Sequence, residues 1–209
     1  MATTRPIRFG FTGGASSKRE KLLDSARTVE ALGYSTFGLA DHFVRPFAPL
    51  IAGQAVADAT TTLRITQTVL AQDFRRPAVL AKELATLDVL SAGRLQVGLG
   101  AGWLRQEYED ASIRFDPASV RIERLEETAV ILKGLFRDEP FSFEGEHYSI
   151  DNLRGTPTPV QRPHPPIMIG GGGRKVLSVA ARQADIVQLM PSNRVAAPRW
   201  TRRSSRARP

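Results

Sequence analysis

The 209-residue chain contains no cysteine, which excludes disulfide bonds and thiolate-ligated metal sites. It also lacks an apolar run of about 20 residues, the length that a membrane-spanning helix needs. The first residues, MATTRPIRFGF, lack the apolar core and cleavage site of a signal peptide. Only three histidines occur, and no two have the spacing of metal ligands. We therefore expect a cytoplasmic protein with no metal and no membrane partner.

Basic residues outnumber acidic ones, 29 to 21, and the formal net charge is +8. Such a charge can indicate a nucleic-acid partner, but residues 194–209 alone hold six arginines and no acid. The rest of the chain is close to balanced and shows no basic face interleaved with aromatic residues. We therefore expect no nucleic-acid partner, and we expect residues 194–209 to form a basic, disordered tail.

Strand and helix patterns alternate along the chain, which is long enough for one sizeable core. Short strands are predicted over residues 7–11, 35–40, 63–70, 94–99, 167–169 and 185–189. Helices are predicted over residues 17–32, 49–59, 77–90, 119–135 and 175–182. Ser17 is expected to cap the first helix, with Glu20 three residues later, and proline occupies the first turn of the third helix.

This alternation indicates βαβ units and a parallel sheet. An open doubly wound sheet and a (β/α)8 barrel both fit, but the first strand ends in FTGGAS rather than in the dinucleotide-binding GxGxxG. Polar and small residues recur at several strand ends, which favours a barrel mouth. Six strands are counted where a barrel needs eight, so we predict an incomplete (β/α)8 barrel, α/β in class, over residues 1–193. Residues 137–166 are expected to leave it as a hairpin and an extended, proline-stiffened connection.

The segment LATLDVLSAGRLQVGLGAGWLRQE, residues 84–107, carries the clearest sign of a ligand site. An apolar helical stripe ends at Gly93, an alternating strand follows, and three glycines then let backbone approach a ligand closely: Gly98, Gly100 and Gly102. A strand that exits through glycines into Trp103 and Glu107 predicts a ligand platform. The alternative is a glycine-rich turn that binds nothing, with Glu107 only anchoring the loop or pairing with an arginine.

His42 is the one histidine that follows a predicted strand end, directly after Asp41, where barrel enzymes place catalytic groups. An imidazole there can accept or deliver a proton while hydride moves to or from a ring carbon. The alternative is a histidine that only bonds a neighbouring strand. The glycines at 170–173 join a strand to a helix and predict an anion-binding turn, the alternative being a flexible turn.

Taken together, these segments resemble the luciferase-like monooxygenase superfamily, especially its branch that uses the deazaflavin coenzyme F420. The resemblance covers residues 5–190 and rests on motifs in the family's order: GLADHF, TVLAQDFRRPAVLAKELATLDVLSAGRLQVGLGAGW, RIERLEETAVILKGLF, FEGEHYSI, PTPVQRPHPPIMIGGGG and AARQADIVQL. It implies a (β/α)8 barrel with an excursion before the fifth strand, and an oxidoreductase acting on a small molecule. Assembly as a homodimer stays open.

The resemblance also implies roles for individual residues. His42 would act as acid or base beside the deazaflavin, with Asp41 at the coenzyme. Thr68-Val69 would form a bulge with a non-prolyl cis peptide behind the ring.

Three further residues are assigned coenzyme contacts by the resemblance: Gln106, Gly171 and Gly172. Trp103 stands where sugar-phosphate dehydrogenases of the family carry a catalytic glutamate. We therefore expect Trp103 to line the pocket of a different substrate.

Three functions are consistent with these residues. The leading one is an F420-dependent oxidoreductase that transfers hydride between the coenzyme and a small organic substrate. The second is an FMN-dependent monooxygenase on the same fold. The third is an inactive, truncated fragment, because two βα units are not counted and the arginine-rich end is typical of a shifted reading frame in GC-rich DNA. A genuine basic tail is the alternative for that last segment.

Overall fold

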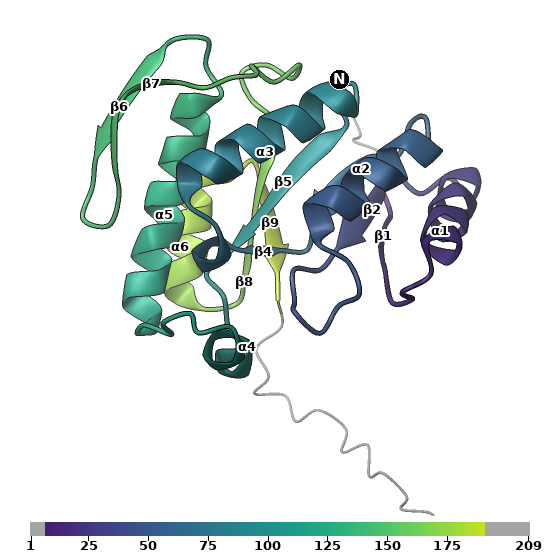
Figure 1. Ribbon diagram of the computed structural model, residues 1–209, viewed down its shortest axis with the longest axis horizontal. Coiled ribbons are helices and arrows are strands. Elements are labelled where there is room, and N and C mark those ends of the chain that lie inside the picture. Colours follow the sequence, from purple (N-terminus) through teal and green to yellow (C-terminus); the bar gives the residue numbers. More distant parts are fainter. Residues whose placement is uncertain (1–6, 191–209) are drawn as a thin grey trace, which may run out of the picture.

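The computed structural model describes residues 7–190, which fold around one parallel, curled β-sheet (Figure 1). Six strands are neighbours in the order of the chain, and each neighbouring pair is parallel: β1 (Gly10–Gly13), β2 (Thr36–Leu39), β3 (Arg64–Gln67), β5 (Leu95–Gly100), β8 (Ile167–Gly171) and β9 (Ile186–Leu189). The short β4 (Leu70–Ala71) continues the line of β3 and also pairs with β5. The predicted parallel order of six strands is confirmed.

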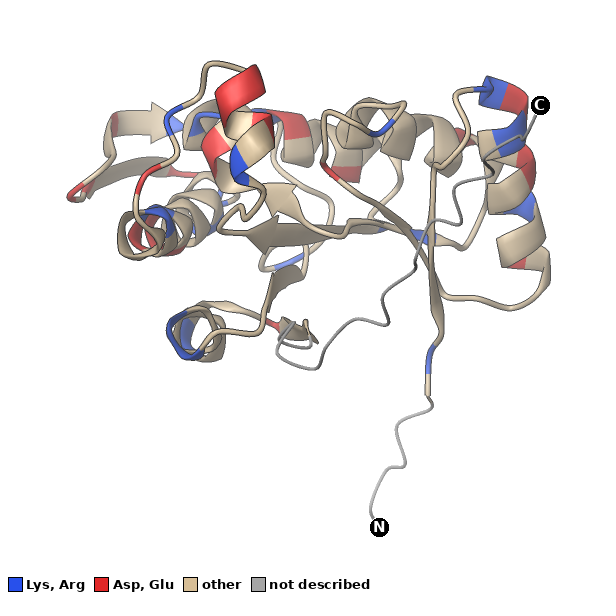
Figure 2. Cartoon of the chain, turned by 90° about the horizontal axis from the view of Figure 1, so that it is seen from below, with Lys and Arg blue, Asp and Glu red and all other residues tan. Residues whose placement is uncertain are grey.

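Helices follow the strands and cover the convex side of the sheet, as the view from below shows (Figure 2). They are α1 (Arg19–Ala31), α2 (Pro49–Ala59), α3 (Pro77–Leu90), α5 (Ala118–Leu135) and α6 (Arg174–Gln183). Proline at the first turn starts α2 and α3, since its fixed φ suits a helix and its missing N–H has no partner there. This arrangement confirms the incomplete barrel. Within residues 7–190, none of the helices combines the length and apolar character needed to span a bilayer.

Two clusters of buried side chains form the core between the sheet and its helices. Phe37, Leu39 and Ile65 pack against α1 and α2, whereas the second cluster joins β5 and β8 to α3, α5 and α6. Because side chains alternate along a strand, the residues between these buried ones face the concave side. Several of them are small, including Gly38 and Gly98, where a Cβ would collide with the Thr68 side chain and the Gln67 backbone.

Local details differ from the sequence-based predictions at several points. Lys18, not Ser17, is the N-cap residue of α1, and no side chain caps this helix, so the predicted Ser17 cap is wrong. The strand predicted over 63–70 is broken into β3 and β4 at Thr68-Val69. A 3₁₀ turn, η1 (Gln72–Phe74), and a six-residue helix, α4 (Arg105–Asp110), were not predicted, because neither is long enough to show a helical period.

The predicted excursion between α5 and β8 is confirmed. β6 (Pro140–Glu144) and β7 (Ser149–Arg154) form an antiparallel hairpin, and the Glu127 carboxylate accepts three backbone N–H groups of its turn. The connection back to the sheet is held by Asp88, which accepts the backbone N–H groups of Val160 and Gln161 and the side-chain amide of Gln161. The excursion therefore docks on α3 and α5, and its Tyr148 hydroxyl donates to Gln72 of η1, directly after β4.

The outermost strands, β1 and β9, present apolar side chains to solvent. Phe11 of β1 is 38% exposed, and Val187 and Leu189 of β9 are 46% and 71% exposed. The tail predicted over 194–209 lies outside the described residues.

Candidate active site

The predicted site residues follow the carboxyl ends of parallel strands, which point to the lower edge of Figure 1, where α4 also lies. Asp41 and His42 follow β2, Thr68 and Val69 follow β3, and Trp103 follows β5. Gly171 and Gly172, at the end of β8, lie at this same edge. The roles assigned to these residues remain predictions, but their common edge matches the place where barrel enzymes carry their sites.

His42 and Glu107 form a close, partly buried pair at this edge. His42 Nδ1 lies 2.7 Å from Glu107 Oε2, and the two side chains are 24% and 5% exposed. Glu107 Oε1 is buried and has no hydrogen-bond partner among residues 7–190. The sequence suggested a loop anchor or an arginine partner for Glu107, so its partner is corrected to His42, 65 positions away.

Asp41 holds the loop that carries His42. Its carboxylate is buried and accepts two hydrogen bonds from the Arg75 guanidinium, at 2.7 and 3.2 Å. It also accepts the backbone N–H of Ala71 at 3.1 Å. A charge-assisted bidentate pair of this kind fixes orientation as well as adding stability, so the two Asp41 oxygens position the ends of β2 and β4.

The Thr68-Val69 peptide bond is cis, as the resemblance implied. Glycines surround it: a Cβ on Gly38 would lie 2.7 Å from Thr68 Cγ2, and one on Gly170 would lie 2.9 Å from Val69 Cγ1. A Cβ on Gly100 would overlap Val69 as well. These glycines let β2, β5 and β8 pack directly against the Thr68 and Val69 side chains, where a larger residue would collide with them.

Gln106 is separate from this group. Its side chain is exposed on α4 and donates to Asp110 Oδ1 at 2.8 Å, one turn along the same helix. Its assigned coenzyme contact remains a prediction that this bond does not support.

Trp103 is 68% exposed, and its ring stands edge-on to the His42 ring with centroids 5.9 Å apart. The preceding Gly102 has φ +71°, and a Cβ there would overlap the Tyr108 hydroxyl. The Arg121 guanidinium donates to the carbonyl oxygens of Ala101 and Gly102. The loop that presents Trp103 is therefore held by glycine geometry and by a buried arginine, which sequence reasoning missed.

A charged cleft of about 770 Å³ lies between η1 and the start of α5, lined among others by Asp73, Arg76, Arg114 and Arg124. Asp73 accepts from Arg124 at 2.9 Å and from the Tyr108 hydroxyl at 3.1 Å. Burial raises the pKa of Asp73, although Arg124 opposes the rise. Burial, and then Asp73, raise the pKa of Tyr108. This network ties η1 and α5 to the helix that carries Glu107.

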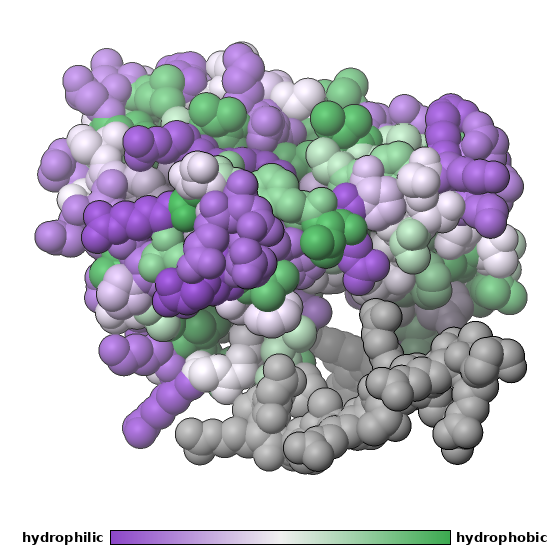
Figure 3. Space-filling view, turned by 60° about the horizontal axis from the view of Figure 1, so that its bottom comes forward, coloured by the Kyte–Doolittle hydropathy of each residue, from purple (hydrophilic) through white to green (hydrophobic). Residues whose placement is uncertain are grey.

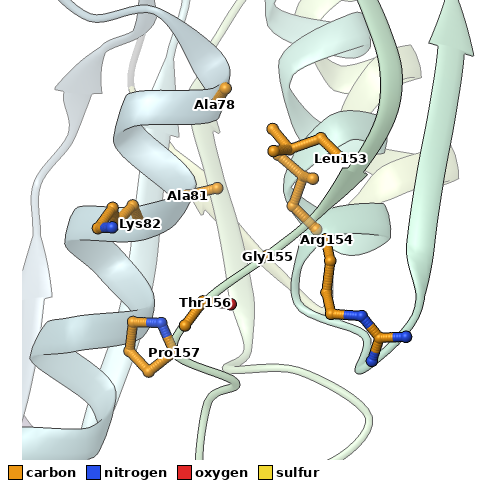
Figure 4. Close-up of a pocket in the computed structure, with 9 residues that line it drawn as sticks. Ala78, Ala81, Lys82, Leu153, Arg154, Gly155, Thr156 and Pro157 are labelled. Atoms are coloured by element: carbon orange, nitrogen blue, oxygen red, sulfur yellow. The ribbon is translucent and has the colours of Figure 1, made fainter.

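A smaller cavity of about 130 Å³ lies between α3 and the end of β7 (Figure 4). Ala78 and Ala81 of α3 face the backbone of residues 153–157 across it. Neither cavity includes His42 or Thr68 in its lining. Within residues 7–190 there is no group of three His, Asp or Glu side chains arranged to hold a metal ion.

A curled parallel sheet with an imidazole–carboxylate pair at the carboxyl ends of its strands defines a barrel-type α/β protein. The sequence model of the luciferase-like monooxygenases matches residues 2–208, and the chain belongs to this family. Members of the family are F420- or FMN-dependent oxidoreductases and monooxygenases, so the resemblance expected from the motifs is confirmed.

Individual relatives use both kinds of coenzyme. An FMNH(2)-dependent dimethylsulfone monooxygenase from Pseudomonas putida is 34% identical over 131 residues, which are 63% of this chain and 36% of that protein. An F420-dependent glucose-6-phosphate dehydrogenase from Kineococcus radiotolerans is 31% identical over 192 residues, 87% of this chain and 56% of that protein. The chain thus spans between about a third and three fifths of such relatives.

Solved structures give the same picture of the fold. The monooxygenase RslO1 from Streptomyces bottropensis superposes with a TM-score of 0.78 at 26% identity, covering 88% of this chain and 60% of that one. The relatives share one fold, and the two named by coenzyme differ in coenzyme and in substrate.

Proposed function

We propose that the chain carries the catalytic half of an F420-dependent oxidoreductase, in which His42 exchanges a proton with a small organic substrate. The observation that carries the proposal is the 2.7 Å contact between His42 Nδ1 and Glu107 Oε2 at the carboxyl ends of the strands. Bound F420 would supply or accept the hydride, and the protein would position it and exclude water.

The histidine is prepared for proton transfer by its partner. With Glu107 ionised, the carboxylate can only accept, so Nδ1 carries the proton and Nε2 keeps its lone pair. A carboxylate behind an imidazole also fixes the orientation of the ring and stabilises its charged form. His42 is thus suited to take a proton from a substrate hydroxyl at Nε2, or to return it in the reverse direction.

Unpaired polar atoms beside Thr68-Val69 fit the polar edge of a ring. Glycines on three strands pack directly against this peptide, and the buried Thr68 Oγ1 and Gln188 Oε1 have no hydrogen-bond partner within residues 7–190. Unpaired buried polar atoms are costly, and a ring with polar edges would satisfy them. The backbone N–H groups at Gly171 and Gly172, beside the start of α6, are the proposed contacts for the coenzyme's phosphate.

Coenzyme titration tests this proposal. F420 and FMN are each titrated into the purified chain and binding is followed by their fluorescence, with the expectation that F420 binds at least about tenfold more tightly, 1.4 kcal/mol. Tighter FMN binding, with oxygen consumption when the flavin is reduced, would favour the monooxygenase. Binding of neither coenzyme would favour an inactive fragment.

Two matched variants test the role of the pair. His42→Gln and Glu107→Gln should retain F420 binding within about twofold and lower the rate of hydride transfer by about 10²-fold or more, the usual contribution of a general acid or base. Glu109→Gln, on the same helix and exposed, is the control and should change neither quantity. Unchanged rates in both variants would remove His42 from the mechanism.

A further inference from the structure

The wall beside His42 is apolar and aromatic. Trp103 stands edge-on to the His42 ring, and Phe43 and Val44, which follow His42 directly, are 59% and 78% exposed. Figure 3 brings this end of the molecule forward and shows apolar surface exposed among polar side chains. Contiguous exposed apolar surface of this kind is a mark of ligand-binding grooves and interaction sites.

The exposure of Trp103 follows from a fixed backbone. Gly102, whose conformation an L side chain rarely adopts, and the Arg121 contacts to two carbonyl oxygens hold the loop in place. Phe43 is anchored on one side by the Phe74 ring, at 4.9 Å between centroids. Rigid aromatic surfaces of this kind bind with little loss of conformational entropy.

The charged groups packed around His42 do not favour an anionic substrate. The Arg75 guanidinium is already paired with Asp41 by two hydrogen bonds, and Arg121 is occupied by carbonyl oxygens. Glu107 adds a buried carboxylate directly behind His42. The groups in contact with the His42 ring are the Trp103 ring and the Glu107 carboxylate, so a phosphate placed against His42 itself would meet a carboxylate. The exposed Arg45 follows three residues later in the same loop.

We infer that the substrate of this site is an uncharged, flat, apolar molecule, such as an aromatic alcohol or ketone, which packs on Trp103 with its oxygen toward His42. Stacking on the indole would hold the ring, and Phe43 and Val44 would cover its far edge. The substrate class rests on the proposed function, but the binding surface itself is present without coenzyme.

Binding is tested in the coenzyme-free chain through the fluorescence of Trp103. The second tryptophan, Trp200, lies outside the described residues and is replaced in a Trp200→Phe background, so that one indole reports. The probes are 2-naphthalenemethanol, which is flat and uncharged, and glucose 6-phosphate. We expect saturable quenching by 2-naphthalenemethanol and none by glucose 6-phosphate at the same concentrations.

Variants test whether the ligand binds at this wall. Their binding of 2-naphthalenemethanol is measured by equilibrium dialysis, a method that needs no tryptophan fluorescence. Trp103→Ala should weaken binding by at least about tenfold, and Trp103→Phe should restore part of it. Val79→Ser, which removes an apolar side chain that is 55% exposed on α3, is the matched control and should bind as the parent chain does. Circular dichroism checks that each variant is folded.

The results separate the two proposals. Trp103-dependent binding supports the substrate class whether or not F420 binds. Equal binding of glucose 6-phosphate, or binding of 2-naphthalenemethanol that Trp103→Ala leaves unchanged, overturns it. If F420 binds while 2-naphthalenemethanol does not, the proposed function stands and the substrate class fails.

Discussion

Replacing Gly98 by alanine tests how closely the strands pack where the site is built. A Cβ on Gly98 would lie 2.8 Å from the backbone carbonyl carbon of Gln67 and closer still to its oxygen. Ordinary van der Waals contact begins at 3.4 Å, and the atoms that must give way are main chain. A side chain could rotate aside, but here β5 itself must move away from the end of β3.

The cost can be worked from this position. Gly98 lies between the pairing of β5 with β3 at Thr66↔Gln96 and its pairing with β4 at Leu70↔Leu99, so a shift strains both. Overpacking a tight site costs about 1–3 kcal/mol, and more when backbone moves, so we expect about 3 kcal/mol here. For a domain of this size that lowers the melting temperature by roughly 6–12 °C.

The assay is thermal unfolding of the two chains, followed by circular dichroism. Gly10→Ala is the matched control, since its Cβ would meet Thr36 at 3.6 Å, an ordinary contact in the same sheet. It should change the free energy of unfolding by less than about 0.5 kcal/mol. Equal melting temperatures for Gly98→Ala and Gly10→Ala would refute the reasoning about packing at the break between β3 and β4.

Three further predictions concern single polar anchors. Burial opposes ionisation of Glu30, but the backbone N–H groups of residues 61–63 lower its pKa from 4.5 to about 2. Its contribution to stability is therefore complete above pH 4.5 and is lost as the pH falls toward 2. In Glu30→Gln, the melting temperature should fall less steeply between pH 4.5 and pH 2 than it does in the parent chain. Asp88→Ala leaves three donors of the excursion unpaired and should lower the free energy of unfolding in urea by about 3–4 kcal/mol. A loss no larger than that of an exposed surface substitution would show that Asp88 does not hold the excursion to α3. Arg94 donates to four acceptors around the start of β5. Arg94→Lys should lower the free energy of unfolding in urea by about 1–2 kcal/mol, because a lysine ammonium cannot replace the several N–H donors of the planar guanidinium.

The sequence predicted those parts of the fold that rest on local pattern. The bounds of α2 and α3 agree with the prediction residue for residue, because a proline begins each helix and an apolar period defines its length. The order of the six strands follows from the βα alternation and from the preference for right-handed crossovers, but the first strand, predicted over 7–11, lies at Gly10–Gly13. The cis peptide at Thr68-Val69 came from the family resemblance, since no local pattern distinguishes it from a continuous strand.

The contacts that build the site could not be predicted, because they join residues far apart in the chain. Nothing near Glu107 indicates that its partner is His42, and α4 is too short to show a period. The sequence showed Gly102 and Trp103 directly after a strand. It did not indicate that Arg121, which lies on α5 and belongs to no motif, holds their loop in place.

The geometry of the His42–Glu107 pair therefore depends on contacts outside the pair itself. Glu107 is carried by α4, and α4 is fixed through Tyr108, whose hydroxyl donates to Asp73, and through Asp73 to Arg124 on α5. His42 is carried by a loop fixed through Asp41 and Arg75. Asp73 and Arg75 belong to one short segment after β4, so a single turn of chain, η1 and the residue after it, sets both halves of the pair. A change in this segment should alter proton transfer without touching either member of the pair.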